Sequence, residues 1–150
     1  MDNENKIRFI CDSMFGKLAK WLRMAGYFAD YIKSTEREKI LKDLSNKQNY
    51  VLITKDKKIL NYNSPVFLLD EIYVKNQFEI IKEKFNLKFD NAFTICMECN
   101  FPLEKTTKEE NKEKIPEFVF KNFNEFFTCK KCGRIYWKGS HYQEMQKKLK

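Results

Sequence analysis

Aspartates stand at the ends of three apolar runs in this sequence. Asp12, Asp56 and Asp70 each come within two residues of the end of such a run. Clustered carboxylates can hold Mg²⁺ or Mn²⁺, which prefer oxygen ligands, and a water bound to such an ion can attack a phosphodiester. Acids at these positions are also common as turn and helix-capping residues, so the positions alone leave both interpretations open.

Cysteines form two Cys-x-x-Cys pairs in the last third of the chain. The pairs are Cys96 with Cys99 and Cys129 with Cys132, and 29 residues separate them. A two-residue gap lets both thiolates of a pair reach one tetrahedral ion, and two pairs complete a closed four-cysteine site. We therefore predict one structural Zn²⁺. Disulfides are disfavoured for a cytoplasmic chain, and the fifth cysteine, Cys11, is expected to be a buried apolar residue.

The elements that must position the acids alternate between strands and helices. Short apolar runs predict strands, and apolar residues at helical spacing predict the helices between them. This alternation is typical of βαβ units, and so of an α/β fold with a parallel sheet flanked by helices. The carboxyl ends of parallel strands lie at one edge, so topology would bring the acids together. The expected strands cover residues 7–11, 29–33, 50–54 and 65–69.

The first helix combines an apolar face with a basic one. Asp12-Ser13 offers an N-cap and Gly26 a stop, and Lys17, Lys20 and Arg23 recur every three residues opposite the apolar side. This stripe is a candidate RNA-binding face.

The second helix supplies the remaining candidate acids. Thr35-Glu36-Arg37-Glu38 has the pattern of a capping box, in which Glu38 would hold the reciprocal position. Glu36 lies one turn before Ile40, closer to the expected buried side. Both glutamates are therefore candidates to complete the acidic site.

The composition favours a polyanionic partner. The chain has 150 residues and a formal net charge of +8, and residues 128–150 hold seven Lys or Arg against one acid. Such clustering suits phosphate contact, with Lys55 and Lys138 as further candidates, although excess lysine is also a common aid to solubility. No stretch has the pattern of a signal peptide or the length of a membrane span, so we expect a cytoplasmic protein without membrane contact.

Several motifs occur along the chain in an order that resembles one known family. They are Asp12-Ser13-Met14, residues 16–23, Gly26-Tyr27, residues 52–56, the paired cysteines, Cys99-Asn100 and residues 136–141. On these motifs the sequence looks like the PIN-like ribonucleases called the Mut-seven C-terminal RNase domain, and the resemblance covers nearly the whole chain. It implies a PIN-like nuclease domain, a C-terminal zinc ribbon and a divalent-metal RNase site formed by Asp12, an acid of the second helix and Asp56.

The sequence departs from this family's pattern at two places. An Asp is usual after Gly-Tyr, where this chain has Phe28, with Asp30 two residues later. The acid of the second helix is usually Asp, whereas this chain offers Glu36, Arg37 and Glu38.

Two functional hypotheses follow from these observations. The first is an endoribonuclease that uses Mg²⁺ or Mn²⁺ at Asp12, Asp56 and Glu36 or Glu38, with residues 1–90 as the nuclease domain and 91–150 as the zinc ribbon with a C-terminal helix. The second is a non-catalytic RNA-binding or ribosome-associated module. The feature that discriminates them is whether three or more carboxylates, Asp30 and Asp70 included, converge.

Overall fold

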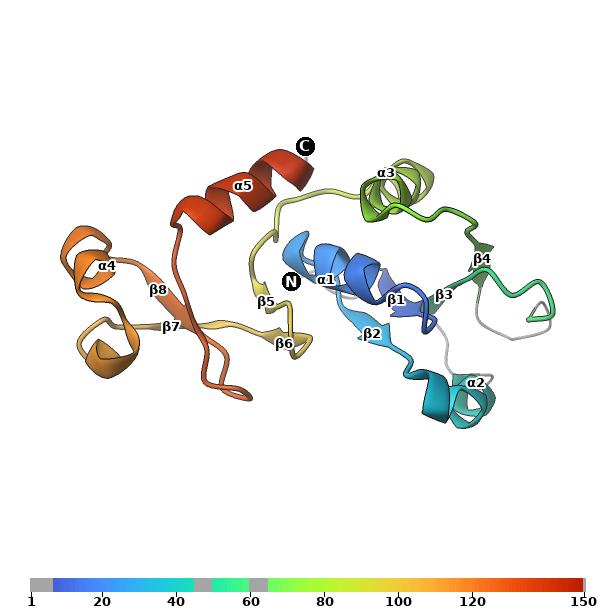
Figure 1. Cartoon of the computed structure of the whole chain (residues 1–150), viewed down its shortest axis with the longest axis horizontal. Coiled ribbons are helices and arrows are strands. Elements are labelled where there is room, and N and C mark those ends of the chain that lie inside the picture. The colour runs from blue at the N-terminus through green and yellow to red at the C-terminus, as the bar shows by residue number, and fades with distance from the viewer. Residues whose placement is uncertain (1–6, 45–49, 60–64, 150) are drawn as a thin grey trace.

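A parallel four-stranded sheet forms the centre of the fold, seen here in a computed structural model (Figure 1). The structure describes residues 7–44, 50–59 and 65–149. The strands lie in the order β2-β1-β3-β4, and every neighbouring pair is parallel. The predicted α/β class is therefore confirmed. The strands are β1 (Arg8–Cys11), β2 (Ala29–Tyr31), β3 (Tyr50–Thr54) and β4 (Val66–Leu68).

Helices lie on both faces of this sheet. They are α1 (Gly16–Met24), α2 (Arg37–Leu44) and α3 (Val74–Phe85). Phe9 and Cys11 of β1 belong to the buried cluster that contains residues of α1 and α3, whereas Ile10 belongs to a second cluster with Leu41 of α2. Successive side chains of a strand point to opposite faces, so a strand covered on both sides is apolar throughout. Within the described residues, no helix is long and apolar enough to cross a membrane.

One end of α1 differs from the sequence expectation and the other agrees with it. No side chain caps its N-terminus, where Phe15 is the capping residue. The predicted N-cap role of Asp12 is therefore wrong, and the carboxylate faces the sheet edge instead. The predicted stop at Gly26 is confirmed, because Gly26 has φ of +98° and a Cβ there would lie 2.3 Å from the carbonyl oxygen of Asn91.

The C-terminal third consists of short antiparallel strands and two helices. β5 pairs with β6, and β7, β8 and β9 form a separate three-stranded sheet. Four cysteines lie around these strands, close enough together to form a metal site. The elements are β5 (Ile95–Cys96), β6 (Phe101–Pro102), β7 (Glu104–Thr106), α4 (Glu117–Asn122), β8 (Phe126–Thr128), β9 (Ile135–Tyr136) and α5 (Ser140–Leu149).

The C-terminal third packs against the sheet domain. The backbone N–H of Phe93 donates to the carbonyl of Met24 at 2.8 Å, and Leu149 of α5 lies in the same buried cluster as α1 and α3. The N–H of Ala29 donates to the side-chain oxygen of Asn100 at 2.9 Å. The architecture changes near residue 90, and a domain boundary there stays a prediction.

Candidate functional site

The carboxyl edge of the sheet brings two of the predicted acids together. Asp12 follows β1 directly and is completely buried, and Asp56 follows β3 and is partly buried. Asp70 follows β4 at the same edge but is exposed. The parallel topology therefore gathers Asp12 and Asp56, as the sequence predicted.

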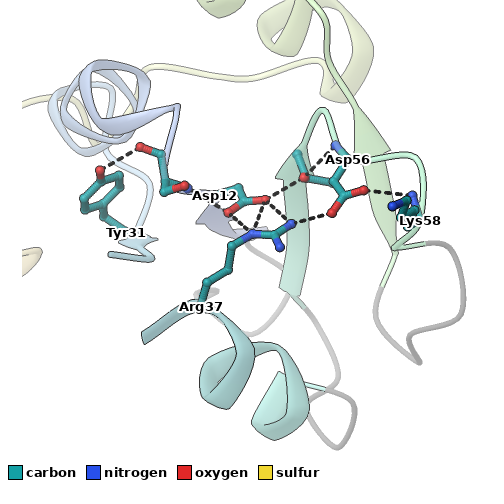
Figure 2. A network of polar contacts seen from close by, with 7 residues as sticks. Asp12, Tyr31, Arg37, Asp56 and Lys58 are labelled. Carbon is teal, nitrogen blue, oxygen red and sulfur yellow. Dashed lines mark hydrogen bonds and ion pairs between the residues drawn. The ribbon is translucent and has the colours of Figure 1, made fainter. Parts of the chain in front are cut away.

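Arg37, the first residue of α2, joins the two carboxylates (Figure 2). Its Nε donates to Asp12 Oδ1 at 2.9 Å, and its Nη2 donates to Asp12 Oδ2 at 3.0 Å. The same Nη2 donates to Asp56 Oδ2 at 2.8 Å. One nitrogen of a single guanidinium is thus shared by both acids.

Further hydrogen bonds fix each carboxylate in place. The hydroxyl of Thr54 donates to Asp12 Oδ2 at 2.6 Å, and the backbone N–H of Ser13 donates to Asp12 Oδ1 at 2.8 Å. The backbone N–H of Lys58 donates to Asp56 Oδ1 at 3.0 Å. Thr54 also accepts the N–H of Asp56 at 3.0 Å, so its hydroxyl links the two acids. These partners lie at or just beyond the ends of the neighbouring strands β1 and β3, so both carboxylates are held by the chain around the sheet edge.

These contacts keep the acids ionised. Burial on its own would raise the pKa of Asp12, but hydrogen bonds from Arg37, Thr54 and Ser13 outweigh it and hold that pKa below its usual range. The N–H of Lys58 and the guanidinium of Arg37 lower the pKa of Asp56. The carboxylate of Asp12 in turn raises the pKa of Arg37. Two anions and one cation leave the cluster with one net negative charge.

Glu36 and Glu38 lie outside this cluster. Both are exposed, Glu36 in a 3₁₀ turn (Ser34–Glu36) and Glu38 in the first turn of α2. Successive residues of a helix point about 100° apart, so a helix that aims Arg37 at the acids turns its neighbours away. Among the described residues, no group of three or more acids is close enough to share a metal ion.

Asp30 and Phe28 likewise take other roles. Asp30 is exposed and accepts a hydrogen bond from the side-chain amide of Asn100 at 2.8 Å. The guanidinium of Arg8 lies 4.6 Å from the centre of the Phe28 ring. Neither position adds a carboxylate to the pair.

The basic stripe of α1 is shorter than predicted. Lys17 and Lys20 are exposed, and Lys20 forms an ion pair with Glu98 at 3.1 Å. Arg23 is only 8% exposed, and it donates to the carbonyl oxygens of Ala29 at 2.8 Å and Met97 at 2.7 Å. Its predicted place on the exposed face is therefore wrong, because these carbonyls draw the guanidinium inward.

The other two predicted RNA contacts are exposed. Lys55 precedes Asp56 at the carboxyl end of β3. Lys138 follows β9 and lies 3.5 Å from a carboxylate oxygen of Glu125. Both ammonium groups are available at the surface, since exposed ion pairs bind weakly.

The four cysteines form a compact group at the C-terminal strands. Their sulfurs all lie within 4.8 Å of one another, and those of Cys96 and Cys132 are 3.9 Å apart. A tetrahedral zinc with bonds of about 2.3 Å separates its sulfurs by about 3.8 Å. The group is therefore positioned to bind a metal ion. Cys11 is fully buried in β1, where burial raises its pKa to about 12, as expected for an unreactive thiol.

A comparison with protein families matches almost the whole chain. A family model described as Mut7-C RNAse domain matches residues 7–149. This range includes the acid pair and all four cysteines. Comparisons with curated proteins and with solved structures found no match.

Stability should depend on pH through the acid pair. A carboxyl whose pKa is lowered by folding adds stability above its unfolded pKa of about 4, and this stability is lost as the pH falls through the folded value. Asp12→Asn should therefore be less stable than the wild type at pH 7, by roughly 3 kcal/mol, because it leaves Arg37 with a neutral buried partner. The difference should shrink below pH 4.

Urea unfolding at pH 7 and pH 3 measures this effect. Asp70→Asn is the matched control, since it removes an exposed carboxylate from the same sheet edge. Equal differences between wild type and Asp12→Asn at both pH values would contradict the expectation.

Proposed function

The chain belongs to the Mut7-C RNase domain family, and from this premise we propose that it is a divalent-metal-dependent endoribonuclease. Membership assigns a ribonuclease-type function with RNA as the substrate. The proposal adds the site and the metal. The observation that carries it is that Asp12 and Asp56, from two different strands, converge on one cationic atom, Nη2 of Arg37.

The chemistry of the donor set suits Mg²⁺ or Mn²⁺. These ions take oxygen ligands, and Mg²⁺ is commonly held by one or two carboxylates together with waters and substrate phosphates. Two carboxylates that share one cation form such a position. Arg37 fills it in this structure, so the acids fit the ion once Arg37 has moved away.

Asp12 and Asp56 would hold the ion, and the ion would supply Lewis acidity and an activated water. Thr54, Ser13 and Lys58 would keep the two carboxylates in position by the hydrogen bonds described above. Preorganised ligands lose little freedom when a cation arrives, which favours its binding. Glu36 and Glu38, on either side of Arg37, would join the site only if the start of α2 shifted.

Exposed lysines would hold the RNA. Lys17 and Lys20 lie on α1, which begins beside Asp12, and Lys55 adjoins Asp56. Lys138 would add a contact from the C-terminal strands. The net charge of +8 supports the approach of a polyanion to this surface.

Several observations favour the alternative of a non-catalytic RNA-binding or ribosome-associated module, and the first is that three or more carboxylates do not converge among the described residues. In the second helix, where the family usually has an Asp, this chain offers Glu36, Arg37 and Glu38, and Phe28 stands where an Asp is usual after Gly-Tyr. Arg37 satisfies both remaining carboxylates without any metal. RNA binding without cleavage would then rest on the same lysines.

The C-terminal metal is proposed to be zinc. Four thiolates are the usual ligands of a structural Zn²⁺ site, and four of them leave no open position for catalysis. The ion would join Cys96 and Cys99 to Cys129 and Cys132, and so hold together the ends of β5 and β8. Its role would be folding, since small ribbons draw their stability from the metal.

Cleavage should require both acids. Asp12→Asn and Asp56→Asn should each lower the rate of RNA cleavage by at least about a hundredfold, because each removes a charge that holds an ion worth several kcal/mol in the transition state. EDTA should abolish cleavage and Mn²⁺ should restore it. The assay follows a labelled RNA mixture, and Asp70→Asn, purified in the same way, should cleave like the wild type.

Equal rates for wild type and Asp12→Asn would show that the activity comes from another site or a contaminant. If wild type binds RNA but cleaves none with Mn²⁺ present, the binding-module alternative is correct.

RNA affinity should fall steeply with salt. Replacing Lys17 and Lys20 by Ala should make the slope of log affinity against log salt shallower by about one for each phosphate that the variant no longer neutralises. The control is a double variant at exposed positions of α3, Lys75→Ala with Lys84→Ala, which removes the same charge. Its slope should stay steeper than that of the Lys17 and Lys20 double variant. Fluorescence anisotropy of a labelled RNA measures both. The same slope in the two double variants would place the RNA elsewhere.

Protein purified without added metal should contain one zinc per chain. Cys129→Ser should lose most of this zinc and the order of the C-terminal strands, because three thiolates hold the ion less tightly than four. Cys11→Ala is the control, since Cys11 is buried in the sheet and should not affect zinc content. Elemental analysis of reduced, folded protein decides, and a value near zero in the wild type would refute the zinc site.

A further inference from the structure

Arg37 occupies the position that the proposed metal ion needs. Nη2 contacts Asp12 and Asp56 at 3.0 and 2.8 Å, so a divalent ion and the guanidinium compete for the same oxygens. Asp12 is fully buried, whereas the side chain of Arg37 is 25% exposed. Nη1 has no hydrogen bond to any described residue (Figure 2). One edge of the guanidinium is therefore open to another partner.

We propose that Arg37 is a phosphate-binding residue that leaves the acid pair for an RNA phosphate when a divalent ion enters. This inference rests on the proposed function, because it assigns the ion to Asp12 and Asp56. It adds a residue that the sequence analysis did not include among the candidates. It also couples two binding events at the site, because metal and RNA each favour the binding of the other.

The balance of charge supports such an exchange. With Arg37 on the acids, the cluster carries one net negative charge and repels a phosphate. With a divalent ion between the two carboxylates, the acid pair is neutralised and the guanidinium is free to pair with the phosphate. Both carboxylates contact a cation in either arrangement.

The burial of Asp12 explains why the two events would be coupled. A buried carboxylate that loses its cation is strongly destabilised, so Arg37 leaves only if another cation replaces it. Arginine suits the second half of the exchange, because its planar fork binds carboxylate and phosphate in the same bidentate manner. By linkage, RNA must then raise the affinity for the ion, and the ion must raise the affinity for RNA by the same factor.

The test measures Mn²⁺ affinity of the zinc-loaded full chain without any need for cleavage. Free Mn²⁺ is followed by electron paramagnetic resonance, with and without a 2′-O-methyl phosphorothioate RNA that resists hydrolysis. Arg37→Gln removes the competing cation. Lys39→Gln is the matched control, because it removes the same charge from an exposed position two residues along α2. Arg37→Lys serves as a second variant that keeps the charge but not the fork.

Without RNA, Arg37→Gln should bind Mn²⁺ more tightly than wild type, on the order of 5- to 150-fold, and Arg37→Lys should lie between them. Lys39→Gln should match the wild type. The RNA should raise the affinity of wild type for Mn²⁺ by a similar factor and that of Arg37→Gln by clearly less. Mn²⁺ should also raise the melting temperature of Arg37→Gln more than that of wild type, which checks that the variant is folded.

Two results would overturn the inference, and they differ in what they leave standing. If wild type and both Arg37 variants bind Mn²⁺ equally well, Arg37 does not compete with the ion, and the proposed metal site survives without the exchange. If none of the proteins binds Mn²⁺ with or without RNA, the acid pair is a permanent salt bridge. The metal-dependent part of the proposed function then fails as well.

Discussion

The burial of one charge, that of Asp12, constrains the whole carboxyl edge of the sheet. Its carboxylate is fully enclosed, and removing one partner of a buried ion pair typically destabilises a protein by about 3 to 5 kcal/mol. Three groups stabilise this buried carboxylate: the hydroxyl of Thr54 from the neighbouring strand, the N–H of Ser13 and the guanidinium of Arg37. The need for a cation beside a buried carboxylate explains why Arg37, and neither glutamate next to it, turns inward.

A second arginine connects this edge to the C-terminal strands through α1. The helix starts close to Asp12, and near its other end Arg23 donates to the carbonyl of Met97, which lies between Cys96 and Cys99. One helix thus contacts both the surroundings of the acid pair and the cysteine group. The same arginine also holds the carbonyl of Ala29 at the start of β2. Loss of order around the cysteines should therefore reach the sheet through Arg23, even though the two parts have separate strands.

The sequence predicted those parts of the fold that depend on local pattern. The strand at residues 50–54 follows from periodicity, and the meeting of Asp12 with Asp56 follows from parallel topology. The inward turn of Arg23 and Arg37 did not follow, because their partners include residues up to 74 positions away and helical spacing alone places a cation on the outer face. β7 was missed for a related reason: its charged residues form a strand only because β8 lies beside it. If the burial of Asp12 had been inferred from the sequence, a cationic partner such as an arginine would have been expected beside it.

The cysteine group and the acid pair differ in how far they depend on a metal ion. The cysteine group brings four sulfurs within 4.8 Å of one another, and a small ribbon of this kind would draw its stability from the ion that joins them. The acid pair carries its own cation in Arg37, so both carboxylates have a cationic partner within the chain. Because this charge comes from within the chain, the ion that we propose for the acid pair would not be needed to stabilise the sheet edge, and it would act in function alone.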